Sequence, residues 1–406
     1  MSSATPATPE AASALRVRVT VVSHTYAVAL NRQKLDRLAA LGFALQVIVP
    51  RRRHEPLREI YVERRAWEPY ALLDLPTWPN HPNALMYAPR ALTRALSAFR
   101  PHIIQIEEEP HSLAMAQVLL ALSALPRSIR LVSFTWRNVE ERYPPPFSLV
   151  ERWADRRVDR VIVGNEDARR LVLARGVPPE RVVKIPQLGV DLATFHPRAR
   201  SLEEPGGPER PLHVGYIGRL APEKGVDTLL RAVRDTNPAI CLTVRGAGPG
   251  RDRLVALAAE LGLMEKVNFL PGVPHDEVAA LMQEFDVLVL PSRTTANWKE
   301  QFGHVLIEAM ACGVPVIGSD SGAIPEVIGD AGLIFPEDDA AALAGLLRRL
   351  LTDRGLREEL SACGLARVTM LYQQEAVARQ TANVYAELLG LIGGRRAEMV
   401  TGQPHD

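Results

Sequence analysis

Short apolar runs rich in valine and isoleucine alternate with helix-like stretches over most of the chain, and no other feature constrains the fold as strongly. The first series of runs lies at 17–22, 44–49, 103–106, 131–134, 160–163 and 182–185. Strands of this length and composition, separated by helices, are typical of a parallel sheet buried on both faces. The first half of the chain is therefore predicted to be an α/β domain.

A second series with the same pattern follows a polar stretch rich in proline and glycine. Its runs lie at 212–217, 240–244, 267–270, 286–290, 315–319 and 333–335. The predicted fold class is therefore α/β, with two doubly wound, Rossmann-like domains. Because such sheets bind ligands at the carboxyl ends of their strands, two domains that face each other would enclose a cleft.

Changes of composition along the chain indicate the domain boundaries. Residues 1–14 are rich in small residues and proline and lack the basic start and apolar core of a secretory signal, so we expect a disordered tail there. The first domain then covers 15–196, the linker 197–211 and the second domain 212–373. A helix and tail at 374–406 could pack on either domain, including by crossing back to the first.

The charge balance narrows the range of functions. Among 406 residues, 48 Lys and Arg side chains stand against 47 Asp and Glu side chains, and the formal net charge is +1. This argues against nucleic acid as a partner, because binding to a phosphate backbone needs many uncompensated cations. Three scattered cysteines indicate a reducing compartment, and no apolar stretch approaches the roughly 18 residues of a membrane-spanning helix. We therefore expect a cytoplasmic protein.

Two arginine-rich segments leave peripheral contact with the inner face of a membrane open. Residues 51–53 are all arginine, and a later helix-like stretch carries Arg90, Arg94 and Arg100. Such segments could attract anionic lipid or another acidic ligand. Neither combines its basic face with a broad apolar one, so a solvated surface is the simpler interpretation.

A strand that runs into a glycine turn and then a helix predicts a phosphate site near the start of the second domain. The segment at 215–225 reads Gly-Tyr-Ile-Gly-Arg-Leu-Ala-Pro-Glu-Lys-Gly. Gly218 permits the turn, and Arg219 and Lys224 flank the start of the helix. Free N–H groups, the positive end of a helix and two cations suit a phosphate. From spacing alone, a solvated first helical turn explains these residues equally well.

A later segment contains two carboxylates eight residues apart, Glu300 and Glu308. Along one helix they would lie ~12 Å from each other, too far to act on one atom as an acid and base pair. They could instead hold two parts of an elongated ligand, while a helix N-terminus near Gly303 faces an anion between them. Two solvated glutamates on an amphipathic helix are the alternative.

Together with two further segments, these motifs resemble retaining glycosyltransferases of family 4. The further segments are Ile-Pro-Gln-Leu-Gly-Val-Asp at 185–191 and Val-Pro-Val at 314–316, which runs into Ser-Gly-Ala-Ile-Pro-Glu at 321–326. All occur in the order seen in the family, and the resemblance covers nearly the whole chain. It implies a GT-B fold, in which an N-terminal acceptor-binding domain and a C-terminal nucleotide-sugar-binding domain face each other across a cleft.

The resemblance also implies how a nucleoside-diphosphate sugar would bind, as a co-substrate and without any cofactor or metal. It puts Arg219 and Lys224 on the diphosphate, Glu308 on the ribose hydroxyls and Glu300 on the hydroxyls of the transferred sugar, with Gly218 in the turn beside them. The backbone close to the sugar and phosphate would come from Gln301, Phe302 and Gly303. Fixed cations and helix N–H groups would stabilise the charge that a departing diphosphate gains.

The loop after the first strand departs from the family pattern. Many relatives have a Gly-Gly loop there that approaches the donor phosphate, whereas this chain has Ser23, His24 and Thr25. Their side chains could donate hydrogen bonds to the phosphate or the acceptor instead. A capping or packing role is the alternative for His24.

Three adjacent carboxylates, at 107–109, follow the third apolar run. Glu107 best matches the family position at which a His or acidic residue points at the reacting sugar, and it joins Glu300, Arg219 and Lys224 as a predicted catalytic residue. It would orient substrates or stabilise an oxocarbenium-like state, because retaining transfer in this family is described as front-face. Favourable charge at a helix N-terminus is the alternative reading of these carboxylates.

The predicted function is therefore metal-independent, retaining transfer of a sugar from a nucleoside-diphosphate sugar to an acceptor hydroxyl. The acceptor would be a saccharide, a lipid or a small molecule, in polysaccharide, glycolipid or glycoconjugate synthesis. A sugar-nucleotide isomerase or a phosphorylase on the same scaffold remains an alternative, because a fold does not determine a function. A nucleotide-sugar-binding protein without turnover is the alternative outside the enzymes.

Overall fold

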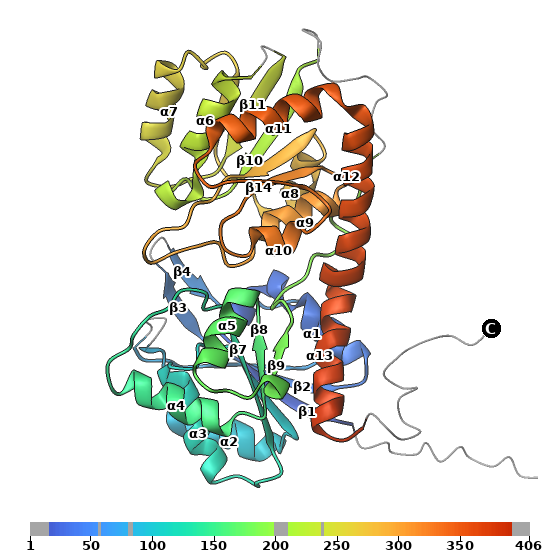
Figure 1. Ribbon diagram of the computed structural model, residues 1–406. Helices are drawn as coiled ribbons and strands as arrows, with labels where there is room; N and C mark the ends of the chain where they lie inside the picture. The colour runs from blue at the N-terminus through green and yellow to red at the C-terminus, as the bar shows by residue number, and fades with distance from the viewer. Residues whose placement is uncertain (1–15, 56–57, 80–83, 199–209, 237–238, 392–406) are drawn as a thin grey trace, which may run out of the picture.

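The computed structural model describes residues 16–55, 58–79, 84–198, 210–236 and 239–391. It confirms the predicted fold class, because two α/β domains, each with its own parallel sheet, lie one above the other (Figure 1). The predicted tail at 1–14 and most of the predicted linker lie outside the described residues.

The first domain is built on a seven-stranded parallel sheet with the order β5-β2-β1-β6-β7-β8-β9. Its strands are β1 (Arg18–Val22), β2 (Ala44–Pro50), β5 (Ala71–Leu75), β6 (Ile103–Ile106), β7 (Arg130–Thr135), β8 (Arg160–Val163) and β9 (Val182–Lys184). Every residue of β6 is buried, as expected for a central strand with helices on both faces.

Helices cover both faces of this sheet. One face carries α2 (Pro89–Phe99), α3 (Leu113–Ser123), α4 (Phe147–Arg157) and α5 (Glu166–Ala174). The other face carries α1 (Gln33–Ala40) and, from much later in the chain, α13 (Gln374–Leu388). Side-chain oxygens of Ser112 and Asn165 accept backbone N–H groups at the starts of α3 and α5, which satisfies donors that a helix end otherwise leaves free.

The second domain has a six-stranded parallel sheet with the order β12-β11-β10-β13-β14-β15. Its strands are β10 (Leu212–Ile217), β11 (Ile240–Arg245), β12 (Val267–Leu270), β13 (Val287–Leu290), β14 (Val316–Ser319) and β15 (Leu333–Phe335). One face packs on α6 (Val226–Arg234), α7 (Arg251–Glu260) and α11 (Ala340–Thr352), and the other on α8 (His275–Met282), α9 (His304–Ala311) and α10 (Ile324–Ile328).

The chain passes between the two domains twice, and the two crossing segments lie side by side. The Val190 N–H donates to the Tyr372 carbonyl at 2.8 Å, and the Gln374 N–H donates to the Val190 carbonyl at 3.1 Å. A π-helix (Val368–Tyr372) joins α12 (Arg354–Arg367) to α13, so that these helices run along one side of both domains (Figure 1). The last helix therefore packs on the first domain.

Several elements lie outside the predicted pattern. β3 (Arg52–Glu55) and β4 (Arg58–Tyr61) form an antiparallel hairpin, and β5 extends the edge of the first sheet. The helix that carries Arg90 and Arg94 begins at Pro89 and ends at Phe99, so Arg100 lies just beyond it. Short 3-10 helices occupy Thr25–Ala27, Ala29–Arg32, Pro179–Arg181 and Pro222–Lys224. Among the described helices, none is both long and apolar enough to cross a bilayer.

Candidate active site

The predicted phosphate-binding turn lies at the carboxyl end of β10. The Gly218 N–H donates to the Arg245 carbonyl at 3.0 Å, and a Cβ at position 218 would come within 2.9 Å of the Tyr216 hydroxyl. That hydroxyl in turn donates to the Arg219 carbonyl at 2.8 Å. The Arg219 side chain is half exposed and pairs with Glu223. The turn is thus rigid, while its guanidinium group remains open to solvent.

Lys224 points toward the loop before α9. Its Nζ lies 2.6 Å from Oε2 of Glu300 and 4.6 Å from the centre of the Trp298 ring. Ser292 donates its hydroxyl to the same carboxylate oxygen at 2.9 Å. The Lys224 and Glu300 side chains are only 17% and 10% exposed, so water screens their attraction weakly. Two of the predicted catalytic residues are therefore in direct contact.

The two glutamates of the later segment belong to different elements. α9 begins at His304, so Glu308 is on the helix and Glu300 is in the loop before it. Gly303 has a φ of 80°, a value that favours glycine, and within the described residues no side chain caps the helix. The positive end of α9 therefore lies between the two carboxylates along the chain. Beside Gly303, Phe302 is buried and Gln301 is exposed.

Glu308 contacts His275, the first residue of α8. The His275 Nε2 lies 3.1 Å from Oε1 of Glu308, and this hydrogen bond raises the pKa of His275 although burial opposes it. Burial lowers the pKa of the neighbouring His304. These three side chains line a pocket of about 250 Å³ between the domains, together with Gln33 of α1 and Asp191 of the first crossing segment. A wider hollow of about 1040 Å³ also includes His275 and Gln33.

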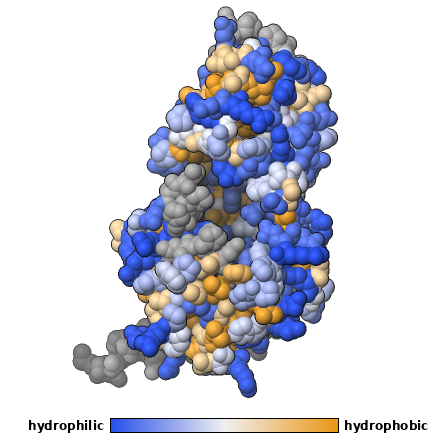
Figure 2. All heavy atoms as spheres, turned by 90° about the vertical axis from the view of Figure 1, so that its left-hand side faces the viewer, coloured by the Kyte–Doolittle hydropathy of each residue, from blue (hydrophilic) through white to orange (hydrophobic). Residues whose placement is uncertain are grey.

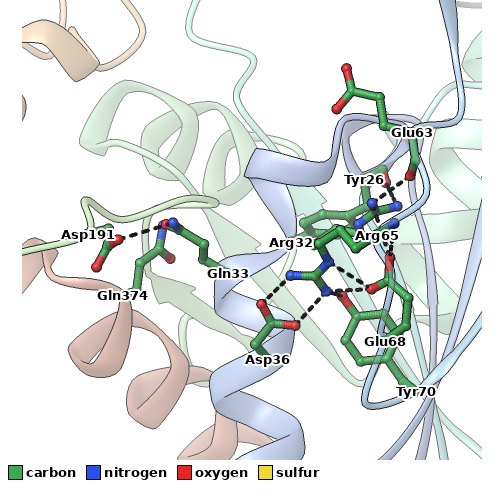
Figure 3. A network of polar contacts seen from close by, with 10 residues as sticks. All are labelled: Tyr26, Arg32, Gln33, Asp36, Glu63, Arg65, Glu68, Tyr70, Asp191 and Gln374. Carbon is green, nitrogen blue, oxygen red and sulfur yellow. Dashed lines mark hydrogen bonds and ion pairs between the residues drawn. The ribbon is translucent and has the colours of Figure 1, made fainter. Parts of the chain in front are cut away.

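Polar contacts fix the first-domain wall of these pockets. Arg32 is fully buried, and its Nη2 donates to the Glu63 carbonyl at 2.6 Å. Arg65 holds both carboxylate oxygens of Asp36 at 2.7 and 2.8 Å, which ties the loop between β4 and β5 to α1 (Figure 3). Bidentate arginine pairs of this kind fix geometry as well as charge.

Gln33, next to Arg32, reaches in the opposite direction, toward the crossing segments (Figure 3). Its amide donates to Asp191 at 3.3 Å and its oxygen accepts from Gln374 at 3.2 Å. Gln374 also donates to the Gly189 carbonyl at 2.9 Å. α1 is thereby joined to both crossings at the edge of the pocket that contains Glu308.

A second group of contacts joins the domains directly at the loop before α9. Nδ2 of Asn138 donates to the carbonyls of Lys299 and Glu300 at 3.2 and 3.0 Å, and Nδ2 of Asn165 donates to the Gln301 carbonyl at 2.8 Å. Both asparagines are at least nine-tenths buried. Their amides hold, from the first domain, the backbone of the loop that carries Glu300.

The loop after β1 contributes mainly His24 and Thr25. Ser23 is fully buried, and its hydroxyl accepts the Thr25 N–H at 3.2 Å. The His24 N–H and Nδ1 both bond to Glu108, at 2.7 and 2.6 Å. Thr25 accepts the Gln187 amide at 3.2 Å. Ser23 thus stabilises the loop, whereas His24 and Thr25 are partly exposed.

Glu107 directly follows β6 and is buried. Its side chain has no exposed surface, and its Oε1 lies 2.9 Å from Nζ of Lys34, which is also buried. Gln187 donates to the other oxygen at 2.9 Å, and Gln105 bonds to the carboxylate as well. These contacts direct the Glu107 carboxylate toward Lys34 of α1 and toward the segment that carries Gln187. In the free protein the Glu107 carboxylate is therefore held in a buried ion pair, and its contact with a reacting sugar stays a prediction.

Three residues of the site were not singled out from the sequence: Asn138, Asn165 and His275. Asn165 stands before Glu-Asp at a helix start, which is a recognisable capping pattern, but nothing in the sequence indicates its bond across the domains. Asn138 lies in an irregular segment, and His275 is the first residue of α8. The bonds of Asn138 and Asn165 follow only from the packing of the second domain against the first, and that of His275 from the packing of α8 against α9.

Family models and solved structures agree on what this architecture is. Residues 198–365 match the model described as "Glycosyl transferases group 1", and residues 10–187 match that of the "Glycosyl transferase 4-like domain". D-inositol 3-phosphate glycosyltransferase of Salinispora arenicola is 34% identical over 266 residues, which cover 60% of this chain and 58% of that protein. The chain thus matches less than two thirds of the length of this relative.

Two solved structures extend the likeness of fold over nearly the whole chain. Sucrose-phosphate synthase of Thermosynechococcus elongatus has a TM-score of 0.71 at 23% identity, covering 93% of this chain and all of the other. Anabaena HepE in complex with UDP-glucose has a TM-score of 0.66 at 16% identity, covering 92% of this chain and all of the other. With the two family models side by side on its two domains, the chain belongs to the group 1 glycosyltransferases and has their GT-B fold.

Proposed function

We propose that this protein transfers a sugar from a nucleoside-diphosphate sugar to a hydroxyl group of an acceptor and retains the anomeric configuration. The observation that carries the proposal is the contact between Lys224 and Glu300 at the strand ends of the second domain, beside the start of α9. A cation, a carboxylate and a positive helix end suit the phosphate and the sugar of one donor molecule.

The diphosphate is proposed to bind between Arg219, Lys224 and the first N–H groups of α9. In the free protein Lys224 is engaged by Glu300, and Arg219 by Glu223. A diphosphate would compete for both cations and release the two carboxylates, of which Glu300 would then accept hydrogen bonds from sugar hydroxyls. Glu308, 16% exposed in the pocket between the domains, would accept the ribose hydroxyls.

Transfer would follow a front-face course, in which the acceptor oxygen attacks on the side from which the diphosphate leaves. The bond between the anomeric carbon and the phosphate oxygen breaks as the bond between that carbon and the acceptor oxygen forms. The leaving phosphate takes the acceptor proton. Arg219, Lys224 and the α9 N–H groups would stabilise the charge that grows on it, and they gain most in the transition state because they are already oriented. Contact between the domains at 299–301 would exclude water and limit hydrolysis of the donor.

The donor base and sugar are proposed from relatives. HepE, whose structure contains UDP-glucose, shares this fold, so UDP-glucose is the first donor to test. The Salinispora relative acts on D-inositol 3-phosphate by its name, so a polyol phosphate is a reasonable acceptor to include beside saccharides and lipids. The protein is proposed to work in the cytoplasm, in the synthesis of a polysaccharide, glycolipid or other glycoconjugate.

The donor is tested by thermal unfolding with UDP, GDP and ADP. A ligand that binds only the folded state stabilises that state and so raises the melting temperature. At a concentration one hundred times its dissociation constant, it raises the free energy of unfolding by roughly 2.7 kcal/mol. We expect one nucleotide to do so in the wild type and in Lys266→Ala, but not in Lys224→Ala. Lys266 serves as the control, because it directly precedes β12 and so lies at the amino ends of the strands, whereas Lys224 lies beyond the carboxyl end of β10. Equal responses of both variants would contradict the proposed site.

Turnover is tested by release of the nucleotide from its sugar, with and without candidate acceptors. Release that rises at least about tenfold with an acceptor, and a product of unchanged anomeric configuration, would support the transferase. Conversion of the donor without any acceptor would favour an isomerase. Formation of a sugar phosphate that depends on added phosphate would favour a phosphorylase. Binding of the donor without conversion would favour a non-catalytic protein.

Metal independence is proposed because the cations of the chain take the role that a divalent ion has in other transferases. Release of nucleotide is therefore expected to continue at an unchanged rate in excess chelator. Loss of turnover in chelator that a divalent ion restores would contradict this part of the proposal without affecting the donor site.

A further inference from the structure

The outer surface of α3 and α4 exposes large apolar side chains. Leu149 and Trp153, one helical turn apart on α4, are 57% and 39% exposed, and Leu120 of the adjoining α3 is 60% exposed. The opposite side of α4 packs Val150 and Ala154 into the core, so the exposed residues are not needed to hold the helix on the sheet. Figure 2 shows apolar side chains gathered on the lower half of this side of the molecule, which is the first domain.

Arginines without partners surround these apolar residues. Arg152 and Arg156 lie on the same stripe of α4, and Arg90 and Arg94 are exposed on α2, which contacts the other side of α3. Within the part of the chain that the structure describes, none of these four guanidinium groups has an ion-pair or hydrogen-bond partner. We name the four arginines with Leu120, Leu149 and Trp153 the basic apolar face.

The first domain as a whole has a charge opposite to that of the rest of the chain. Residues 16–196 contain 27 Lys and Arg against 18 Asp and Glu, whereas residues 197–406 contain 21 against 28. The net charge of +1 therefore hides an excess of positive charge in the domain that carries the basic apolar face. A surface of anions would attract this end of the molecule and repel the other, which orients the protein before contact.

We propose that the basic apolar face docks on an anionic lipid bilayer. Leucine and tryptophan side chains enter the boundary between headgroups and acyl chains, while arginines beside them bind lipid phosphates, which is the pattern of interfacial helices. α4 lies parallel to the bilayer in this arrangement, and its buried side keeps its place in the core. Each arginine near an anionic surface strengthens binding by about fivefold, and each inserted apolar side chain adds to this.

A second copy of the chain fits this face less well. A two-fold symmetric contact would put the same patch against itself, so that four unpaired arginines would face four more. An anionic bilayer removes this repulsion and also buries the apolar side chains. This inference is independent of the proposed catalytic activity, because it concerns binding alone.

Vesicle flotation tests the proposal with the full chain. Vesicles of phosphatidylcholine alone are compared with vesicles in which a third of the lipid is phosphatidylglycerol. We expect the protein to float with the anionic vesicles, less so as salt is raised, and not with the neutral ones. Arg152→Glu/Arg156→Glu should weaken binding by more than about 25-fold, and Leu149→Glu/Trp153→Glu by about tenfold or more.

Matched changes in the second domain control for charge and exposure. Arg253 is exposed on α7 and Met264 is 54% exposed, so Arg253→Glu and Met264→Glu should leave flotation unchanged. Circular dichroism should show all variants folded, because every changed side chain is at the surface. Three results would overturn the proposal: no binding to either vesicle, equal loss in the control variants, or concentration-dependent dimerisation that the α4 variants abolish.

Discussion

The amide group of Asn165 makes two different hydrogen bonds, one within its own domain and one across the cleft. Its Oδ1 accepts the Ala168 N–H at 2.8 Å and so caps α5, while its Nδ2 donates to the Gln301 carbonyl at 2.8 Å. Asn138 supplies a similar donor to the two preceding carbonyls. These donors couple the position of the first domain to the conformation of the loop that holds Glu300.

Asn165→Asp separates the two bonds, because aspartate keeps the capping oxygen and replaces the donor by a second acceptor. We expect the free energy of unfolding to fall by about 1 to 3 kcal/mol, because the buried carboxylate faces the Gln301 carbonyl without a donor. Turnover of the folded variant should fall by about tenfold to a hundredfold, since the Glu300 loop loses its fixed position. Nucleotide affinity should change by less than about twofold. Unchanged turnover, or a loss of turnover that merely parallels a loss of stability, would show that the bond to Gln301 does not matter for activity.

The raised pKa of His275 determines whether its contribution to stability grows or falls with pH. The hydrogen bond to Glu308 raises its folded pKa above the usual 6.5, so the protonated ring stabilises the folded state below that value and the contribution is lost as pH rises through the folded pKa. The ring is 42% exposed, so the effect should stay below about 1 kcal/mol. Denaturant unfolding between weakly acidic and weakly basic pH should show this loss in the wild type and not in His275→Gln; parallel curves would contradict it.

At the scale of elements, the three consecutive carboxylates after β6 contact three different parts of the first domain. Glu107 pairs with Lys34 on α1, Glu108 bonds to His24 after β1, and Glu109 accepts the Thr135 hydroxyl at 2.6 Å. Burial raises the pKa of Glu109. One strand end therefore anchors a helix, a loop and a neighbouring strand.

Glu107→Gln is accordingly expected to reduce stability more than activity. The substitution leaves the Lys34 ammonium buried without a counter-charge, which should cost about 3 to 5 kcal/mol. Removing the charge as well, in Glu107→Gln/Lys34→Met, should recover a large part of that loss. Denaturant unfolding measures both effects, and a stable single variant with greatly reduced turnover would instead support the predicted catalytic role of Glu107.

The sequence predicts those elements whose formation depends on residues close together in the chain. Apolar runs such as 103–106 and 212–217 have one stable solution, a strand buried between helices, and the structure confirms them. The β3–β4 hairpin has no such run, because its strands are charged and lie outside the main sheets. The turn at Gly218 could be predicted from its glycine and cations, whereas the bonds of Asn138 and Asn165 depend on how two domains meet.

At the scale of the whole molecule, contacts with different roles join the two domains. On one side the chain itself connects the domains, and the two crossing segments are hydrogen-bonded to each other at Val190 and Gln374. Elsewhere the asparagine amides hold the loop at 299–301, and Nζ of Lys184 lies 2.7 Å from the Glu326 carboxylate. The crossings cannot separate, but side-chain bonds can. Opening of the cleft would therefore break the asparagine and lysine contacts while the crossings act as the hinge.

The central claim is that the second domain holds a diphosphate between Lys224, Arg219 and the start of α9, with Glu300 and Glu308 on the sugars at its two ends. A crystal structure with an unreactive analogue of the donor selected by the nucleotide screen tests this most directly. The claim requires phosphate oxygens within hydrogen-bonding distance of Lys224 Nζ and of the α9 N–H groups, and ribose hydroxyls at Glu308. A diphosphate bound out of reach of these groups, with the Lys224–Glu300 pair intact, would contradict it.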